Sequence, residues 1–147
     1  MLATGRARRR RVVADSAAAV ADTHAILFHA AGGRRLGSKA AAMFERCERQ
    51  QAIIYVPSIV MWEVSLLARV SRVNLRRTVR GFFDDLFSNP SYQPVDMTAE
   101  QIYIADELRF SRDPFDLLIC AAARALDLPL LTRDADIRTA GVVRVIW

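Results

Sequence analysis

The sequence predicts an α/β domain in which a parallel sheet of about five strands is flanked by about seven helices. From Ala17 onward, short β-like runs alternate with longer helical ones, which is the pattern of strands joined by crossover helices. Residues 53–56 form a β-branched and aromatic run closed by Pro57, whereas residues 115–126 are apolar on nearly all sides. Such a strand and such a buried helix are typical of a sheet covered on both faces.

The strands are predicted from short apolar runs that end at turn-forming residues. In chain order they cover residues 18–21, 53–56, 92–95, 128–131 and 142–146. The helices are predicted from apolar residues at helical spacing. In chain order they cover residues 25–31, 39–50, 59–70, 75–87, 99–108, 115–126 and 134–139. The third and fourth helices follow one another directly, so they are expected to form a helical hairpin.

The ends of these helices are predicted from capping residues. Ser38 and Ser58 precede helical runs and are the predicted N-caps of the second and third helices. Thr98, followed by Gln101, has the spacing of a capping box. Pro114 stands where the most apolar helix begins, a position that proline favours. Glycines at 32–33 and the Asn-Pro pair at 89–90 end the first and fourth helices.

The composition is that of a globular protein. Hydrophobic residues make up 52% of the chain and charged residues 25%, which excludes a long disordered or low-complexity region. Cys47 and Cys120 lie in separate apolar stretches without CxxC spacing, so we expect reduced core thiols. Asp15 and Asp22 interrupt the apolar run that follows the N-terminal arginines, and no stretch is long enough to span a bilayer. The expected location is the cytoplasm.

Most of the net positive charge lies at the N-terminus. The chain has 21 Lys and Arg residues against 16 Asp and Glu residues, and five of the arginines stand between positions 6 and 11. Without those five arginines the charges balance, so the high net charge is weak support for nucleic-acid binding by the folded part. Residues 1–17 are expected to be a disordered basic arm, or sequence upstream of the native start, and residues 18–147 the folded domain.

Four acidic residues stand near one edge of the predicted sheet. Asp22 and Asp134 follow strands, Glu63 lies one turn into a helix after a strand, and Asp116 lies in the first turn of the apolar helix. Ligand sites of open α/β sheets form beyond the carboxyl ends of the strands. Each aspartate has an alternative role as a helix cap. Glu63 stands among apolar neighbours, where an unpaired carboxylate is costly to bury.

Several carboxylates at one place repel each other unless a hard cation lies between them. Mg²⁺ takes oxygen ligands and suits such a site, whereas the two histidines of the chain, His24 and His29, supply a zinc site poorly. A carboxylate-held Mg²⁺ favours hydrolysis of a phosphodiester. The predicted hairpin region also carries a basic set that could contact phosphates or form a solvated surface paired with Asp84 and Asp85: Arg69, Arg72, Arg76, Arg77 and Arg80.

Four segments and the C-terminal residues, taken in this order and spacing, carry a resemblance to a known family. They are Ala21-Asp22-Thr23-His24-Ala25, Pro57-Ser58-Ile59-Val60-Met61-Trp62-Glu63, Arg112-Asp113-Pro114-Phe115-Asp116-Leu117-Leu118-Ile119, Leu131-Thr132-Arg133-Asp134 and Val145-Ile146-Trp147. The chain resembles the PIN-domain ribonucleases, and among them the VapC-type toxins of bacterial type II toxin–antitoxin pairs. The likeness covers residues 20–147.

The resemblance implies a PIN-like three-layer fold and an RNA-cleaving endonuclease that uses Mg²⁺ or Mn²⁺. By matching position, Asp22, Glu63 and Asp116 would form the metal-binding core and Asp134 the fourth acid. Three further residues lie near them in the motifs: Thr23 and Thr132, which would hydrogen-bond a water or a phosphate, and Asp113, a close neighbour of the site. The implied partners are the RNA substrate, a cognate antitoxin and a second copy in a homodimer.

Other functions remain open at this point. A PIN-like RNA-processing nuclease would lack a neighbouring antitoxin gene, and a catalytically silent module that binds RNA or protein would not need all four acids. A phosphoacceptor signalling domain needs a lysine on a late strand, but the only lysine is Lys39. A phosphatase with paired Asp-x-Asp acids is disfavoured because Thr23 and His24 follow Asp22.

Overall fold

Residues 17–147 are described by a computed structural model, and they hold five strands and seven helices. The predicted basic arm lies outside the described residues except for Ala17, and the domain boundary at residue 18 stays a prediction. The strands are β1 (Ala18–Ala21), β2 (Ile53–Pro57), β3 (Tyr92–Val95), β4 (Leu130–Leu131) and β5 (Val145–Ile146). The helices are α2 (Thr23–Ala30), α3 (Ser38–Glu48), α4 (Ser58–Arg69), α5 (Val79–Phe87), α6 (Ala99–Glu107), α7 (Pro114–Leu126) and α8 (Ala135–Ala140).

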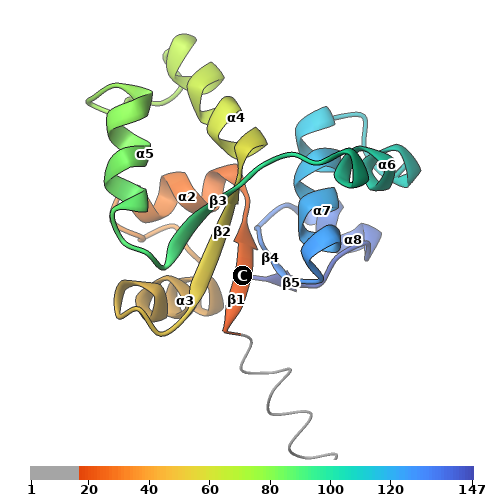
Figure 1. The fold of residues 1–147 in the computed structure, drawn as a ribbon, viewed down its shortest axis with the longest axis horizontal. Coiled ribbons are helices and arrows are strands. Elements are labelled where there is room, and N and C mark those ends of the chain that lie inside the picture. Colours follow the sequence, from red (N-terminus) through yellow and green to blue (C-terminus); the bar gives the residue numbers. More distant parts are fainter. Residues whose placement is uncertain (1–16) are drawn as a thin grey trace, which may run out of the picture.

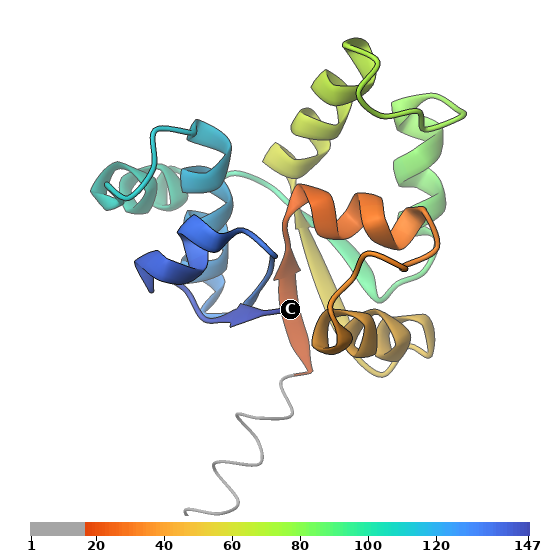
Figure 2. The ribbon, with the colours of Figure 1, turned by 180° about the vertical axis from the view of Figure 1, so that it is seen from behind.

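All five strands are parallel and form one sheet in the order β3-β2-β1-β4-β5, with β1 at its centre. Ala18 lies opposite Ile53 on one side of β1, and Val20 lies opposite Leu130 on the other. Helices α2 and α3 lie on one face of the sheet, and α7 lies on the other with α6 packed against it (Figures 1 and 2). The predicted α/β fold is confirmed. Because every strand runs the same way, the loops after all five strands meet at one edge.

The core lies on both faces of the central strand. Ala19, Val20 and Ala21 of β1 have no exposed surface, and they share the core with Ile119 and Cys120 of α7 among other residues. Both cysteines are free and buried, as predicted. Within residues 17–147, no helix combines the length and the apolar character that crossing a membrane requires.

Two helices begin differently from the prediction. Ser38 and Ser58 are the first helical residues of α3 and α4, and the N-cap positions belong to Gly37 and Pro57, which make no side-chain cap hydrogen bond. At α3, the Lys39 amide donates instead to the Trp147 carbonyl at 3.3 Å. A backbone carbonyl from the far end of the described chain thus accepts one of the amides left free at the start of α3. Thr98 and Pro114 stand at the ends of α6 and α7 as predicted.

Other elements are shorter than predicted because local turns interrupt them. Helix α5 begins at Val79, not at residue 75, since the Thr78 hydroxyl accepts from the Gly81 amide and caps the helix there. Strand β4 begins at Leu130 because α7 ends at Asp127 in the left-handed conformation (φ 53°). The predicted hairpin is present: α4 and α5 contact each other and lie side by side in Figure 1.

Candidate active site

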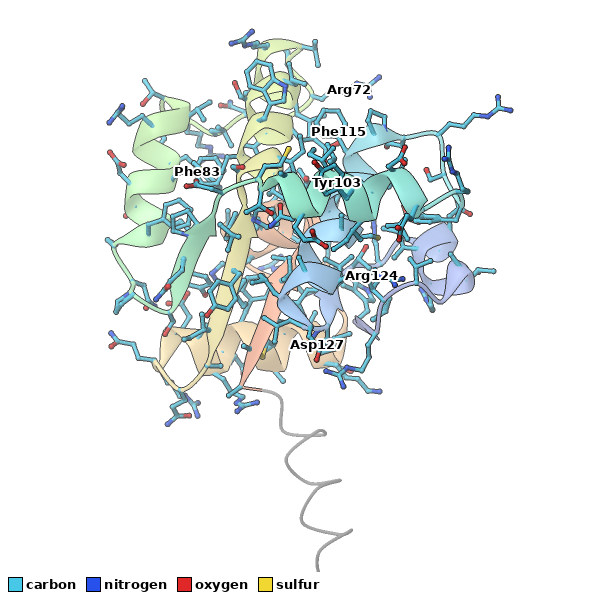
Figure 3. All side chains as sticks on the ribbon, turned by 45° about the vertical axis from the view of Figure 1, so that its right-hand side comes forward. Arg72, Phe83, Tyr103, Phe115, Arg124 and Asp127 are labelled. Carbon is cyan, nitrogen blue, oxygen red and sulfur yellow. The ribbon has the colours of Figure 1, made fainter. Side chains whose placement is uncertain are left out.

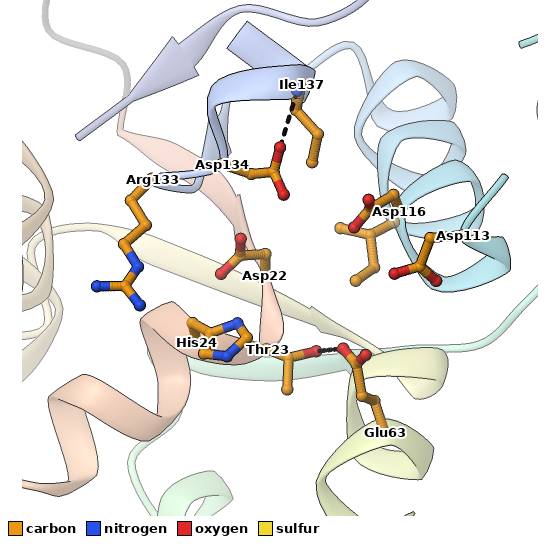
Figure 4. A pocket seen from close by; sticks show the side chains of 10 residues that line it. Asp22, Thr23, His24, Glu63, Asp113, Asp116, Arg133, Asp134 and Ile137 are labelled. Atoms are coloured by element: carbon orange, nitrogen blue, oxygen red, sulfur yellow. Dashed lines mark hydrogen bonds between the residues drawn. The ribbon is translucent and has the colours of Figure 1, made fainter. Parts of the chain in front are cut away.

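A pocket of about 320 Å³ lies at the edge of the sheet where the strands end. It is built from the β1–α2 junction, α4, the start of α7 and the β4–α8 junction (Figure 4). Its lining residues are Asp22, Thr23, His24, Glu63, Asp113, Asp116, Ile119, Arg133, Asp134 and Ile137. The structure therefore brings together all four predicted acids, with Thr23 and Asp113. Thr132 is fully buried beside them and is not a lining residue.

Two of the acids are fixed by the helices that they cap. Asp22 directly follows β1, and its Oδ1 accepts from the Ala25 amide at 2.9 Å, so α2 begins at Thr23 and not at residue 25 as predicted. Asp134 follows β4, and its Oδ1 accepts from the amides of Asp136 and Ile137 at 2.8 and 3.0 Å. The helix-cap role and a place in the pocket are thus compatible: the Oδ2 atom of Asp134 makes no such cap bond.

The two acids at the start of α7 are held differently. Asp113 is the N-cap, and its Oδ1 accepts from the Phe115 amide at 2.9 Å. Asp116 caps nothing, and the Ser111 hydroxyl donates to its Oδ2 over a long 3.5 Å. Burial, followed by repulsion from Asp113 and other acids, raises the pKa of Asp116 to about 7.

Glu63 projects from the second turn of α4, and its partner is a hydroxyl. Thr23, on α2, donates its hydroxyl hydrogen to Glu63 Oε1. Burial raises the pKa of Glu63, and the Thr23 hydrogen bond opposes that shift. Burial likewise raises the pKa of Asp22, opposed by a side-chain hydrogen bond with Thr132. Three carboxyl groups of one pocket therefore resist ionisation in the absence of a cation.

This donor set fits a hard divalent cation. The chemically suitable ligands in the pocket are carboxylate oxygens, and no cysteine lines it. Among residues 17–147, no three acidic, histidine or cysteine side chains are gathered tightly enough to enclose an ion by themselves. Mg²⁺ keeps several of its waters and is bound by few direct carboxylate ligands, so an open pocket with opposed carboxylates suits it better than a tight protein cage.

The profile of the PIN domain family matches residues 19–143, which is most of the chain. This chain belongs to the PIN-domain family. The resemblance seen in the sequence is therefore confirmed at the level of the family. A search of the curated proteins finds no significant match.

Solved structures with the same fold include VapBC2, a toxin–antitoxin complex and FitAcB. VapBC2 from Rickettsia felis, bound to a DNA fragment from its promoter, has a TM-score of 0.62 and 17% identity over 87% of this chain and 96% of that one. A toxin–antitoxin complex from Klebsiella pneumoniae has a TM-score of 0.58 and 20% identity over 88% of this chain and 96% of that one. FitAcB from Neisseria gonorrhoeae has a TM-score of 0.54 and 19% identity over 86% of this chain and 94% of that one. At these identities the likeness establishes the shared PIN fold.

The sequence did not assign two residues that lie at this PIN-domain site. Arg133 lines the pocket, and its only signal was its place inside one of the motifs. Ser111 reaches Asp116 from just outside a motif. The basic residues of the predicted hairpin do not all lie on its helices, because Arg76 and Arg77 are in the loop before α5. Arg77 forms an ion pair with Asp85 at 3.4 Å. This ion pair supports the reading of a solvated surface for part of that set.

Proposed function

We propose that this PIN domain is a Mg²⁺-dependent endoribonuclease of the cytoplasm and the toxin of a toxin–antitoxin pair. One observation carries the proposal: five carboxylates from four separate chain segments line one pocket, and three of them resist ionisation without a cation. Such an arrangement is costly for a structural role, because buried like charges destabilise the fold. A functional site accounts for that cost.

Asp22, Glu63 and Asp116 would hold the metal, with Asp134 as a fourth carboxylate, and Mn²⁺ could replace Mg²⁺. When bound, the ion supplies a water of lowered pKa and neutralises charge on the phosphate and the leaving oxygen. The chain's own contribution is to position these carboxylates. Thr23 orients Glu63, Thr132 hydrogen-bonds Asp22, and the α8 cap holds Asp134. Ile119 and Ile137 provide the apolar part of the pocket wall.

The test is cleavage of total cellular RNA by purified protein with Mg²⁺ or with EDTA. Asp22→Asn and Asp116→Asn keep side-chain size and remove the charge, so each should abolish metal-dependent cleavage. Asp127→Asn is the matched control. Asp127 is exposed at the far end of α7 from Phe115 (Figure 3), and asparagine tolerates its left-handed conformation. Absence of cleavage by folded, metal-loaded wild-type protein would contradict the proposed function.

The proposal includes a cognate antitoxin and a homodimer. The toxin–antitoxin complex among the structural neighbours supports the antitoxin. Exposed apolar side chains support a dimer. They are Trp62 on α4, Val70 at the C-cap of α4, and Ile102 and Tyr103 on α6. Expression should arrest growth, co-expression of the neighbouring reading frame should restore it, and light scattering on the purified protein should give twice the monomer mass. Expression without growth arrest would contradict the toxin role, and arrest that persists beside every neighbouring reading frame would contradict a cognate antitoxin encoded there.

A further inference from the structure

A pair of arginines lies over one aromatic ring beside the acidic pocket. The guanidinium carbon of Arg133 is 4.6 Å from the centroid of the Phe28 ring, and that of Arg35 is 5.7 Å from it. Arg133 follows β4 and lines the pocket, whereas Phe28 belongs to α2. Figure 4 shows Arg133 next to His24, on the side of the pocket away from Glu63 and Asp113. The pocket therefore has a basic side and an acidic side.

The Phe28 ring is a fixed support. It is only 7% exposed, and its neighbours are the Trp147 ring, edge-on at 6.2 Å between centroids, and the His24 ring at 5.9 Å. A cation over the face of a ring is attracted by the negative charge of that face, so Phe28 restricts where the two guanidinium groups lie. Arginine over an aromatic ring keeps its N–H donors free at the edges of the guanidinium plane.

Apart from its contact with the Phe28 ring, the guanidinium of Arg133 has no carboxylate partner among the described residues, although five carboxylates line the same pocket. The loop that carries Arg133 is also held by hydrogen bonds that do not involve its side chain. The Thr132 hydroxyl accepts from the Asp134 amide at 3.1 Å, and Asp134 caps α8, so the turn is held by its own hydrogen bonds.

We propose that Arg133, supported by Phe28 and accompanied by Arg35, binds a backbone phosphate of the RNA strand next to the bond that is cut. This inference rests on the proposed function and names how its substrate is held. A polyanion approaching five carboxylates is repelled, and a fixed cation at the rim offsets that repulsion. The planar guanidinium donates two parallel hydrogen bonds to phosphate oxygens. The strand would thus cross the pocket from the basic side to the acidic side.

The experiment measures binding of a short fluorescein-labelled single-stranded RNA by anisotropy at several KCl concentrations. The nuclease-inactive Asp22→Asn protein is the parent, and Arg133→Ala, Arg133→Lys and Arg144→Ala are added to it. Arg144 is exposed and precedes β5, at the edge of the sheet opposite the pocket. Arg144→Ala therefore removes the same charge as Arg133→Ala, but far from the pocket. Phe28→Leu tests the support, with circular dichroism to establish that this variant is folded.

Arg133→Ala should weaken binding about three- to tenfold and reduce the slope of log K against log salt by about 0.7, the share of one phosphate contact on a single strand. Arg133→Lys and folded Phe28→Leu should lie between Arg133→Ala and the parent, because lysine lacks the fork and leucine lacks the ring. Arg144→Ala should match the parent. In the active background, Arg133→Ala should raise KM more than it lowers kcat.

Equal affinity and equal salt slope for Arg133→Ala and its parent would overturn this inference, and the rim would then be free to bind a partner's acidic side chains. If wild-type protein still cleaves RNA, the proposed function stands in that case. If Arg144→Ala lost as much RNA affinity as Arg133→Ala, the inference would also be overturned, because net charge alone would then explain the effect. A wild-type protein that neither binds nor cuts RNA would remove the proposed function and this inference together.

Discussion

The hydroxyl of Thr23 donates a hydrogen bond to Oε1 of Glu63, and this bond joins α2 to α4 across the acidic pocket. The two residues are 40 positions apart in the sequence. Thr23 is almost wholly buried. Its hydroxyl therefore fixes the direction of a carboxylate that stands on another helix, and it favours the ionised form of that carboxylate against the effect of burial.

Replacing Thr23 with valine should weaken metal binding without unfolding the protein. Valine keeps the branched shape and loses the hydroxyl, so Glu63 loses its orienting partner and its pKa rises further. Removing an outer hydrogen-bond partner of a ligand costs about 10- to 100-fold in metal affinity or activity. Titration calorimetry with Mn²⁺ measures the affinity, and Thr23→Ser, which keeps the hydroxyl, should bind nearly as wild type. Equal Mn²⁺ affinity in the valine variant would contradict an orienting role.

The raised pKa of Asp116 predicts a pH-dependent stability in the metal-free protein. The folded-state pKa of Asp116, about 7, lies above the ordinary value, so the folded protein favours the protonated form of this carboxyl group. The contribution of that form to the free energy of unfolding is fully present below the ordinary value and is lost as pH rises through 7. In EDTA, the melting temperature should fall between about pH 5 and pH 8. Asp116→Asn removes the ionisable group, so its melting temperature should change less over that range and exceed that of wild type at pH 8.

Divalent metal should reverse this trend. At pH 8 the carboxylates are ionised and Mg²⁺ or Mn²⁺ should raise the melting temperature of wild type, whereas at pH 5 protons compete with the ion and the rise should be small. Asp116→Asn should show a reduced rise at both pH values. Thermal scans with EDTA, Mg²⁺ and Mn²⁺ make the comparison. A metal-induced rise that is independent of pH would show that Asp116 does not bind the ion.

The sequence predicted the acids of the pocket and missed its basic side for a physical reason. Asp22 and Asp134 were recognised because they directly follow strands, and all parallel strands end at one edge of the sheet. The position of Arg133 over Phe28 depends on the packing of two segments that are remote in sequence, and no local spacing encodes it. The same limit applies at the start of α3, where the Lys39 amide donates to the carbonyl of Trp147, a residue remote in sequence.

Asp134 is predicted to have two separable roles. Its Oδ1 accepts two amide hydrogens at the start of α8, which an asparagine oxygen can also do. Asp134→Asn should therefore keep the stability of the wild type and lose much of the cleavage activity. Asp134→Ala should lose activity and also about 0.5–2 kcal/mol of unfolding free energy. Urea denaturation and RNA cleavage measured on both variants separate the roles, and full activity in Asp134→Asn would remove this residue from the metal site.

Gly37 is predicted to be required for packing at the start of α3. A Cβ atom built there lies 2.4 Å from the carbonyl carbon of Trp147 and 2.6 Å from its Cδ1, so Gly37→Ala must displace backbone as well as a ring. Overpacking of this kind costs about 1–3 kcal/mol. Gly81→Ala is the matched control, inside a helix that favours alanine. Its Cβ would meet no backbone, only the Thr78 hydroxyl at 3.2 Å and side-chain atoms of Arg77 at 3.7 and 3.9 Å. Urea denaturation should show a clear loss of unfolding free energy for Gly37→Ala and a smaller change for Gly81→Ala.

Because Trp147 also packs on Phe28, the Gly37→Ala variant should in addition weaken the support of Arg133 and raise KM for RNA.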